Sequence, residues 1–331
     1  MLKKLLNDPF DAVDEMLDGF VDAHADVIRL AAPRVVARRE AAYDKVGLVV
    51  GGGSGHEPAF AGYVGAGLAD AAACGNVFAA PSPDVCLDAI RAASSGRGVL
   101  LCYGNYAGDV LNFDLAAELA AGEGIATATL RVSDDVASAP PQDRAARRGI
   151  AGDVFVFKVA GAAAERGDDL AGVAALAGRA NDACRSLGVA LSACEVPGSG
   201  RPTFEIGPDE LEIGMGVHGE PGIRRGTLEP ADAVAEQMLE AILADWRADG
   251  VEGGEAALLV NGLGATPYMD LYVLYRAARR GLEAAGWTVS RSFVGEYVTS
   301  LEMAGASFSV LRLDDELRAL LDAPARTARL P

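Results

Sequence analysis

Short apolar runs that end at glycine-rich loops recur along this chain. VGLVV at 46–50 leads into GGGSG, and GVLLCYG at 98–104 leads into NYAGD. A continuous apolar run between such loops is typical of a strand buried on both faces of a sheet. Alanine-rich segments at 114–122 and 170–187 have helical character and lie between or after these strands. We therefore predict an α/β fold of two α/β domains, each with a central sheet that is largely parallel or mixed.

The same patterns predict the other elements. Apolar residues have helical spacing over 9–30, and helices are also predicted at 231–247 and 266–286. Further strands are predicted at 125–132, 153–160, 188–198, 255–265, 287–295 and 308–313. A chain of 331 residues is long enough for two domains, and we place the boundary near residue 187. The domain 1–187 then carries the GGGSGHEP and NYAGD loops, and the domain 188–331 carries GMGVHGEPG.

The charge of the chain argues against several classes of partner. The 47 Asp and Glu residues outnumber the 29 Lys and Arg residues, and the formal net charge is −18. Nucleic acids and anionic membrane surfaces both attract clustered cations, so neither is expected as a partner. The first residues lack the apolar core of a signal peptide, and no uncharged apolar stretch reaches the ~18 residues of a transmembrane helix. We expect a soluble, cytoplasmic protein.

The five cysteines do not form a ligand or disulfide pattern. Cys74, Cys86, Cys102, Cys184 and Cys194 are odd in number, have no C-x-x-C spacing, and lie among apolar or small residues. Zinc sites and disulfide frameworks have tighter, paired spacings. We expect these side chains to fill the core in a reducing compartment.

The glycine-rich loops do not make a convincing nucleotide site. GGGSG could bind an anion through its backbone N–H groups. A Walker loop, however, needs G-x-x-x-x-G-K-[ST], and here His56, Glu57 and Pro58 follow. GMGVHG matches G-x-G-x-x-G in letters, but it lies in the second half of the chain rather than at a first βα turn. We therefore expect neither an ATP site nor a NAD site on this chain.

The histidines are the strongest candidates for chemistry. The chain has three, and two of them share a setting: His56 in G-H-E-P and His218 in H-G-E-P, each in a glycine-rich loop. Asp109 lies in a third such loop, whereas His24 lies in the first predicted helix and is expected to be structural. Histidine acts as a nucleophile or a general acid or base near neutral pH, because its pKa is near 6.5. Metal binding is the weaker reading, since the H-x-x-x-H spacing of a helical metal site is missing.

Many segments together resemble the K subunits of dihydroxyacetone kinases. In chain order they are GGGSGHEPAFAGYVGAG, CGNVFAAPS, NYAGDVLNF, RRGIAG, KVAGAAAERGDDL, CEVPG, ELEIGMGVHGEPG, VNGLGATP and LDAPA. The resemblance extends from the N-terminal DPFDAVDEM to the last of these segments. Matching loops in the correct order across the chain are more specific than any single motif. The resemblance implies a two-domain α/β subunit, normally a homodimer, that binds a short ketose.

The resemblance also implies roles for particular residues. His218 is expected to attack the ketone and form a covalent hemiaminal, which only a carbonyl compound can do, so glycerol is excluded. Asp109 is expected to be the general base for the hydroxyl that attacks the phosphoryl group. His56 is expected to hydrogen-bond the substrate and assist proton transfer. The Gly53 N–H is a further expected contact, and the substrate-binding set is completed by Ser54 and Gly104.

The same resemblance places the nucleotide outside this chain. In the family ATP or ADP and its magnesium belong to an L module, which is either fused C-terminally or a separate protein. The chain ends soon after DAPA, so a separate L-type partner is expected, with no cofactor or metal bound by this chain. Whether the phosphoryl donor is ATP or a phosphotransferase-system protein stays open at this stage.

Three positions depart from the family pattern. The family's aspartate loop commonly reads K-N-Y-T-G-D, but this chain has Gly104 in place of the Lys and Ala107 in place of the Thr. In the segment CGNVFAAPS, Ala80 stands where the family usually has Ser or Thr. The changes are either drift in an Ala- and Gly-rich chain or an adaptation to a larger ketose such as a tetrulose. Two other hypotheses are weighed: a non-catalytic ketone-binding co-regulator of a transcription factor, and a NAD-dependent enzyme. The presence of both His56 and Asp109 favours the kinase subunit over the co-regulator.

Overall fold

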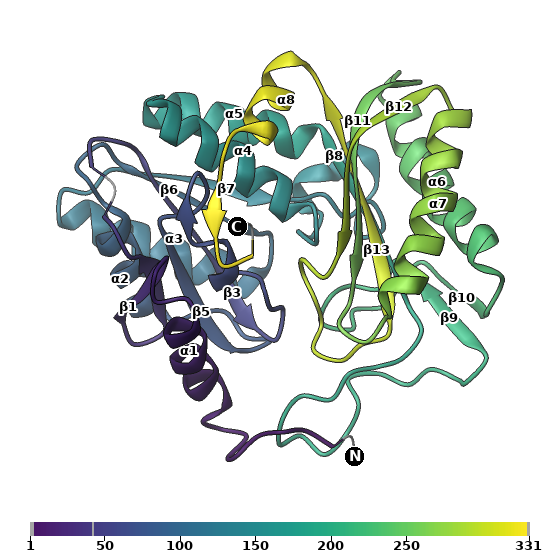
Figure 1. The fold of residues 1–331 in the computed structure, drawn as a ribbon, viewed down its shortest axis with the longest axis horizontal. Helices are drawn as coiled ribbons and strands as arrows, with labels where there is room; N and C mark the ends of the chain where they lie inside the picture. Colours follow the sequence, from purple (N-terminus) through teal and green to yellow (C-terminus); the bar gives the residue numbers. More distant parts are fainter. Residues whose placement is uncertain (1–2, 42, 330–331) are drawn as a thin grey trace. The chain divides into compact units, whose positions relative to one another are not determined.

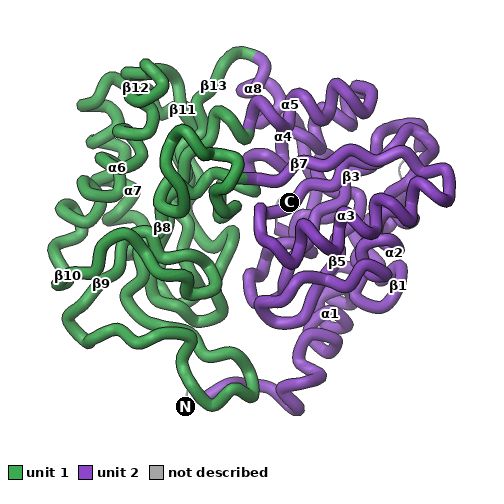
Figure 2. Tube along the Cα trace, turned by 180° about the vertical axis from the view of Figure 1, so that it is seen from behind, with its two compact units in different colours: residues 1, 133–153, 181–315 green, residues 2–132, 154–180, 316–331 purple. Residues whose placement is uncertain are grey.

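The computed structural model describes residues 3–41 and 43–329, and the chain divides into two compact units (Figure 2). Unit 1 contains 133–153 and 181–315, and unit 2 contains 2–132, 154–180 and 316–331. Each unit is therefore assembled from segments that are far apart in the sequence. The expected continuous domains 1–187 and 188–331 differ from this division. Residue 187 lies inside a strand, and 133–153 joins the unit formed mainly by the second half of the chain.

Unit 2 is built on a six-stranded mixed sheet (Figure 1). The strand order is β1 (Ile28–Ala32), β2 (Val35–Arg38), β5 (Ala71–Val77), β3 (Gly47–Ser54), β6 (Val99–Gly104) and β7 (Thr127–Val132). β5, β3, β6 and β7 are parallel to one another, whereas β1 and β2 pair antiparallel. Every residue of β3 and β6 is buried, as expected of central strands covered on both faces.

The helices of unit 2 lie before, between and after the strands of its six-stranded sheet. They are α1 (Ala12–Ala23), α2 (Pro83–Ala93), α3 (Ala107–Gly122), most of α4 (Asp153–Arg166) and α5 (Leu170–Asp182), and α8 (Asp315–Asp322). α2 begins where a helix is well capped: Ser82 Oγ accepts the Val85 N–H at 3.4 Å, and Pro83 follows the cap. Residues of α2 and α3 form one apolar cluster with β2, β3, β5 and β6. A short pair, β4 (Gly65–Ala66) with β14 (Arg326–Thr327), completes the unit.

Unit 1 is built on a second six-stranded mixed sheet. The strand order is β10 (Arg224–Thr227), β9 (Glu210–Ile213), β8 (Cys184–Ala190), β13 (Gly305–Leu313), β11 (Gly254–Gly262) and β12 (Trp287–Gly295). Only β11 and β12 pair in parallel. The helices α6 (Ala231–Ala248) and α7 (Tyr268–Ala284) lie side by side against the sheet (Figure 1) and share its apolar core. The α/β fold class and the mixed sheets agree with the prediction, although this sheet is mostly antiparallel.

One predicted strand is a helix. Residues 153–160 were predicted as a strand, but they form the first half of α4. Val154, Phe157 and Ala160 are buried, as is nearly every other residue of this half of the helix, including Lys158. A helix that is buried all round has an apolar sequence without a polar face, so its 3.6-residue period is hidden. The small Gly161 matters to this packing, because a Cβ there would lie 2.5 Å from the Cα of Leu68.

Other predicted boundaries shift by a few residues. The helix predicted over 9–30 ends at Ala23, and β1 begins at Ile28. The strand predicted at 188–198 is β8, which begins at Cys184 and ends at Ala190. The burial predicted for the five cysteines is confirmed. Among the described residues, no helix is both long and apolar enough to span a membrane.

Candidate functional site

In unit 2 the GGGSGHEP segment forms the end of β3 and the turn after it, and it is tied to the end of β5 and the residues that follow. Ser54 Oγ donates to the Gly75 carbonyl at 2.8 Å, and the Phe78 N–H donates to the Ser54 carbonyl at 2.9 Å. A Cβ on Gly53 would lie 2.8 Å from the Ala79 nitrogen, so only glycine fits at this close backbone approach. The structure thus packs the loop that carries Gly53 and Ser54 against residues 75–79.

His56 is held inside this loop rather than on the surface. Its side chain is buried, and its ring stacks on that of Phe78 with centroids 5.0 Å apart and planes at 20°. The neighbouring Glu57 accepts the Gly55 N–H with both carboxylate oxygens at 3.0 Å. Burial raises the pKa of Glu57, against the effect of these backbone hydrogen bonds. A stacked, buried imidazole has few accessible orientations, which suits a hydrogen-bonding role more than that of a mobile nucleophile.

Asp109 lies in the first turn of α3, directly after β6. Its carboxylate is largely buried at the positive end of the helix dipole, where negative charge is stabilised. Asn112, one turn further along, donates through Nδ2 to the Pro81 carbonyl at 2.8 Å. A Cβ on Gly108 would lie 3.2 Å from the Cβ of Ala80. Ala80 therefore packs beside the turn that carries Asp109.

The predicted residues of unit 2 thus lie on one edge of its sheet. The segments after β5, β3 and β6 all follow the carboxyl ends of neighbouring parallel strands, which is where ligands bind in such sheets. Gly104 is the buried last residue of β6, and its carbonyl accepts the Tyr106 N–H at 2.8 Å. Ala107 is the exposed first residue of α3.

His218 belongs to unit 1, in the loop 214–222 between β9 and β10. The Gly214 N–H donates to the Gly188 carbonyl at 2.7 Å, and Ser300 Oγ donates to the Val217 carbonyl. Gly219 has φ +86°, a left-handed conformation that glycine adopts without strain. The loop is therefore attached to the end of β8 and to residue 300, and it presents a half-buried imidazole.

A carboxylate orients the His218 ring. Glu220 Oε1 lies 3.0 Å from His218 Nδ1, and Glu220 Oε2 accepts the His218 backbone N–H at 3.0 Å. Burial alone would raise the pKa of Glu220, but the hydrogen bond and the charge of His218 outweigh it and hold the pKa at about 2. Glu220 is thus ionised at neutral pH. The sequence alone assigned no role to Glu220, although its place two residues after His218 put a carboxylate within reach of the ring.

The third histidine, His24, lies outside these loops. His24 follows α1 directly, and its ring lies against Phe20 with centroids 4.9 Å apart, as expected for a structural residue. In the part of the chain that the structure describes, no group of three or more His, Cys, Asp or Glu side chains is arranged to hold a metal ion.

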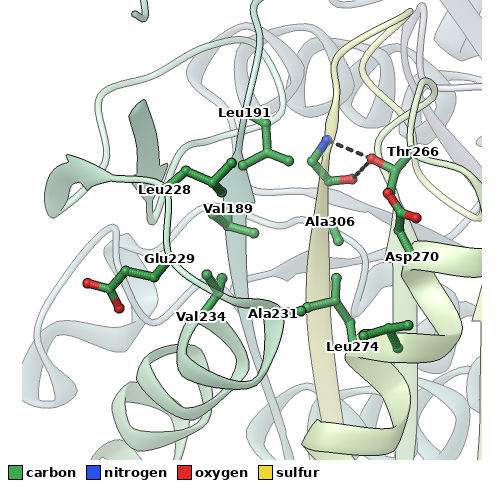
Figure 3. Close-up of a pocket in the computed structure, with 12 residues that line it drawn as sticks. Val189, Leu191, Leu228, Glu229, Ala231, Val234, Thr266, Asp270, Leu274 and Ala306 are labelled. Atoms are coloured by element: carbon green, nitrogen blue, oxygen red, sulfur yellow. Dashed lines mark hydrogen bonds between the residues drawn. The ribbon is translucent and has the colours of Figure 1, made fainter. Parts of the chain in front are cut away.

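A pocket of about 300 Å³ in unit 1 is a different feature (Figure 3). It lies at the end of β8 and the beginning of β13, beside the first turns of α6 and α7, with Val189, Leu274 and Ala306 in its walls. Thr266 Oγ1 accepts the Gly305 N–H at 2.8 Å and donates to the Gly305 carbonyl at 2.6 Å, so its hydroxyl is hydrogen-bonded to the backbone of the pocket wall. A mostly apolar lining suits a polyhydroxylated ligand poorly, and the predicted site residues do not line this pocket.

Two six-stranded mixed sheets, each with helices packed against it, define a two-unit α/β protein. Its candidate site residues include a carboxylate-oriented histidine in unit 1 and a helix-terminal aspartate in unit 2. The chain belongs to the Dak1 domain family, which matches residues 18–329.

Two relatives show how this family is built. The chain is 45% identical over 329 residues to a "PTS-dependent dihydroxyacetone kinase 2, dihydroxyacetone-binding subunit DhaK" of Listeria innocua, covering 98% of both chains. It is also 45% identical to an "L-erythrulose 1-kinase" of Mycolicibacterium smegmatis, with 98% of this chain and 57% of that protein covered. The chain thus spans almost all of the first relative and little more than half of the second.

Solved structures share the fold. The dihydroxyacetone kinase of C. freundii has a TM-score of 0.89 and 35% identity, and all of this chain covers 60% of that one. The "dihydroxyacetone kinase operon co-activator Dha-DhaQ" has a TM-score of 0.90 and 31% identity, with 96% of this chain and 97% of that chain covered. The same fold therefore occurs in proteins named as kinases and in one named as a co-activator.

Proposed function

We propose that this chain is the ketose-binding subunit of a dihydroxyacetone kinase and that it holds a short ketose covalently on His218. The observation that carries the proposal is the Glu220 carboxylate 3.0 Å from His218 Nδ1. Where Nδ1 carries the proton, the lone pair of the ring lies on Nε2, the atom that can attack a carbonyl. The 45% identity to a subunit named as dihydroxyacetone-binding supports the same substrate class.

The covalent step selects the substrate by its carbonyl group. Nε2 of His218 forms a bond to the carbonyl carbon, the π electrons of the C=O bond move to the oxygen, and the oxygen takes up a proton. A polyol such as glycerol has no such carbon and forms no adduct. Selection by a missing functional group is much stronger than selection by size.

The residues of unit 2 serve the phosphoryl transfer. We propose that Asp109 is the general base for the ketose hydroxyl, because it is a buried carboxylate at a helix N-terminus, at the same sheet edge as the ends of β3 and β5. His56 hydrogen-bonds the substrate and assists the proton transfer, and the Gly53 N–H is a further contact. Ser54 and Gly104 complete the substrate-binding set. Phosphoryl transfer itself depends mainly on positioning and on stabilisation of charge.

The phosphoryl group comes from a second protein. A relative that this chain spans almost completely is named as one subunit of a PTS-dependent kinase. We therefore propose an L-type partner subunit that holds ATP or ADP and magnesium, and a homodimer of this chain in the cytoplasm. The donor to that partner is ATP or a phosphotransferase-system protein.

The substrate is dihydroxyacetone or a four-carbon ketose. Ala80, which packs at Gly108 beside Asp109, has a methyl group where the family usually has a hydroxyl-bearing side chain. Each lost hydroxyl contact changes binding by ~1 kcal/mol, so a shift toward a tetrulose is physically reasonable. A relative of equal identity named as an L-erythrulose kinase favours the same extension.

A co-regulator is the second candidate, favoured by the likeness to the co-activator structure. Such a protein would bind the ketone and report it to a transcription factor without turnover. The two candidates share the ketone adduct and differ in phosphorylation.

Two measurements test the proposal. In ¹³C NMR with [2-¹³C]dihydroxyacetone, the wild-type protein should show a protein-bound tetrahedral carbon signal that is distinct from those of the free hydrate and dimer. The His218→Ala variant should lack this bound signal, and glycerol should give no bound signal with either protein. A coupled assay with the cognate L-type subunit, run with each donor over three- to five-carbon ketoses, should show phosphorylation. Absence of the tetrahedral carbon refutes the covalent site. An adduct without phosphorylation by either donor leaves the co-regulator as the function.

A further inference from the structure

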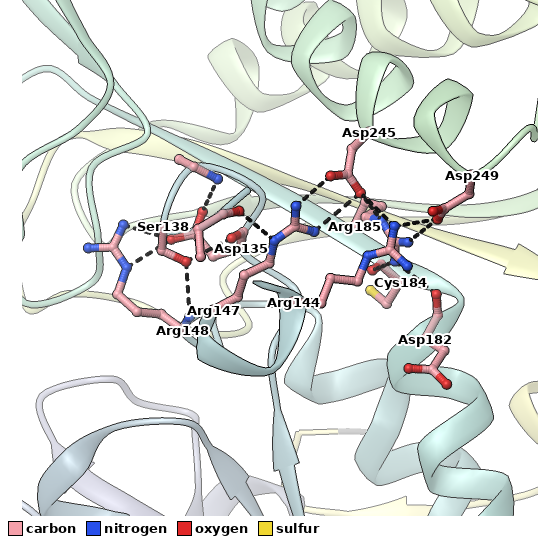
Figure 4. A network of polar contacts seen from close by, with 12 residues as sticks. Asp135, Ser138, Arg144, Arg147, Arg148, Asp182, Cys184, Arg185, Asp245 and Asp249 are labelled. Atoms are coloured by element: carbon pink, nitrogen blue, oxygen red, sulfur yellow. Dashed lines mark hydrogen bonds and ion pairs between the residues drawn. The ribbon is translucent and has the colours of Figure 1, made fainter. Parts of the chain in front are cut away.

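Arg148 reaches the loop of His218 from a distant part of the sequence. It lies in 133–153, the segment that joins unit 1 ahead of β8. Its Nε donates to Asp135 Oδ2 at 2.9 Å, and its backbone N–H donates to Ser138 Oγ at 3.0 Å (Figure 4). Its Nη2 donates to the Gly214 carbonyl at 3.2 Å, at the beginning of the His218 loop. The guanidinium is thus mostly buried and held from both sides.

The same guanidinium faces Glu220. Arg148 Nη1 lies 3.9 Å from Glu220 Oε2, the oxygen that accepts the His218 N–H. The other oxygen, Oε1, is the one beside Nδ1 of the imidazole. Each oxygen of this carboxylate therefore lies against the backbone or ring of His218, and the guanidinium of Arg148 adds a coulombic attraction from 3.9 Å.

Gly216 provides the room for this arrangement. A Cβ at position 216 would lie 2.1 Å from Glu220 Oε2 and 2.7 Å from Arg148 Nη1. Both atoms are the ends of flexible side chains, so an alanine would push them away and leave the backbone where it is. Glycine is needed at position 216 because a larger side chain would occupy the space of the Glu220 and Arg148 side chains.

We propose that Glu220 and Arg148 are positioning residues that hold His218 in the tautomer protonated at Nδ1. The inference rests on the proposed function in that it takes His218 as the nucleophile. In the opposite tautomer the Nδ1 lone pair would face a carboxylate oxygen, acceptor against acceptor, at 3.0 Å. Only the tautomer with its proton on Nδ1 has its lone pair on Nε2, where the ketone is attacked.

The pair also stabilises the product of that attack. When Nε2 bonds to the carbonyl carbon and the oxygen takes a proton from hydronium or a buffer acid of the solvent, the ring is alkylated at Nε2 and still protonated at Nδ1. It is then a cation, and the carboxylate of Glu220 lies directly against it. A carboxylate that both orients an imidazole and stabilises its cation has the same relation to it as the aspartate in serine protease triads.

The test uses variants that change the pair in two independent ways. Glu220→Gln keeps the size of the side chain, but its amide can donate to Nδ1 and so favours the wrong tautomer. Gly216→Ala keeps both charges and displaces them. Glu236→Gln, an exposed glutamate of α6, and Gly178→Ala, a helix position with open space around it, are the matched controls.

The first readout is ¹⁵N NMR of the ligand-free protein with ¹⁵N-labelled histidine, which has three imidazoles to assign. Wild type and both controls should have His218 protonated at Nδ1, whereas Glu220→Gln should be protonated at Nε2. Gly216→Ala should show a mixture of the two tautomers. The second readout is the ketone Kd, which should rise about 10- to 100-fold in Glu220→Gln, the range for a hydrogen bond to a charged group.

The outcomes separate this inference from the proposed function. If His218 keeps the Nδ1 tautomer in Glu220→Gln and in Gly216→Ala, the positioning role is refuted, whatever the ketone does. If wild type forms no ketone adduct, the proposed function fails, but the tautomer in the ligand-free protein still decides the role of the pair. A variant that does not fold is replaced by Arg148→Lys, which should shift the tautomer in the same direction, and an unchanged tautomer there also refutes the role.

Discussion

The sharpest stability prediction concerns the carboxylate of Asp245 in unit 1. Asp245 lies between two arginines that are almost completely buried, Arg147 at 0% and Arg185 at 1% exposure. Arg147 Nη1 donates to Asp245 Oδ1 at 3.2 Å and its Nη2 to Oδ2, while Arg185 Nε donates to Oδ1 (Figure 4). The second carboxylate of the network, Asp249, accepts from Arg185 Nη2 at 2.9 Å but is one-third exposed. One buried carboxylate therefore balances two buried cations.

The substitution Asp245→Asn keeps the shape and removes the charge. Removal of one partner of a buried ion pair costs about 3–5 kcal/mol, because the remaining charge stays buried without compensation. We expect the lower end, about 3 kcal/mol, since Asp249 and the face of Trp246, 4.2 Å from the Arg185 guanidinium, still stabilise part of the charge. Asp249→Asn should cost less than about 1 kcal/mol, as for exposed pairs.

Urea denaturation followed by tryptophan fluorescence measures this loss. The two tryptophans, Trp246 and Trp287, both lie in unit 1 with ring centroids 5.7 Å apart, so their signal reports the unfolding of that unit. The reasoning is refuted if Asp245→Asn lowers the free energy of unfolding by no more than Asp249→Asn does. It is also refuted if a large loss is measured for both variants alike.

Four other predictions concern individual side chains. His218→Ala should abolish stable ketone binding in calorimetry, and wild-type turnover in that variant would contradict the covalent mechanism. Asp109→Asn should still form the adduct while kcat falls by about 10²–10⁴, and a loss under tenfold would reduce Asp109 to a positioning role. Burial lowers the pKa of Lys158 to about 8 from 10.5, so its protonated form is disfavoured in the folded protein and stability rises between pH 8 and 10.5. Lys158→Met should therefore be more stable than wild type by about 1–3 kcal/mol at pH 7, with the gap closing toward pH 10.5 in urea titrations. The double substitution Ala80→Ser and Ala107→Thr should raise the ratio of kcat/KM for dihydroxyacetone to kcat/KM for a four-carbon ketose. An unchanged ratio would show that the small residues at these positions are sequence drift without effect on specificity.

How well the sequence predicted each element depended on where its apolar residues were buried. β3 and β6 were predicted because a buried strand is a short apolar run with glycine at its end. α6 was predicted because its buried residues, such as Met238 and Ile242, recur at helical spacing beside exposed acidic residues. α4 was mistaken for a strand because its burial on all sides removes that contrast. A fully buried apolar run is assigned to a strand from its pattern, which is right for β3 and β6 and wrong for α4.

The candidate site was predictable to the extent that its residues lie in local motifs. His56, Asp109 and His218 each belong to a short glycine-rich loop, and a rare residue type in such a loop is visible in the sequence alone. Glu220 accepts the hydrogen bond of His218 from only two residues away, so the H-G-E order placed the carboxylate near the ring without showing that the two groups meet. Arg148 was invisible, because its contact with the loop of His218 depends on the return of 133–153 into unit 1.

Because the segment 133–153 belongs to unit 1, its adjacent residues Arg147 and Arg148 contact different parts of that unit. Arg147 is buried against Asp245 and anchors 133–153 to α6, where it can be exchanged for another residue only at a large cost in stability. Arg148, the next residue, points to the loop 214–222 and lies within reach of Glu220. The buried Arg147 holds this segment, so the Arg148 guanidinium is in position before any ligand binds. Ligand binding therefore does not include the entropic cost of ordering the Arg148 side chain. The loop 214–222 is itself anchored through Gly214 and Val217, and the buried pair of Arg147 and Asp245 fixes the segment from which Arg148 reaches that loop.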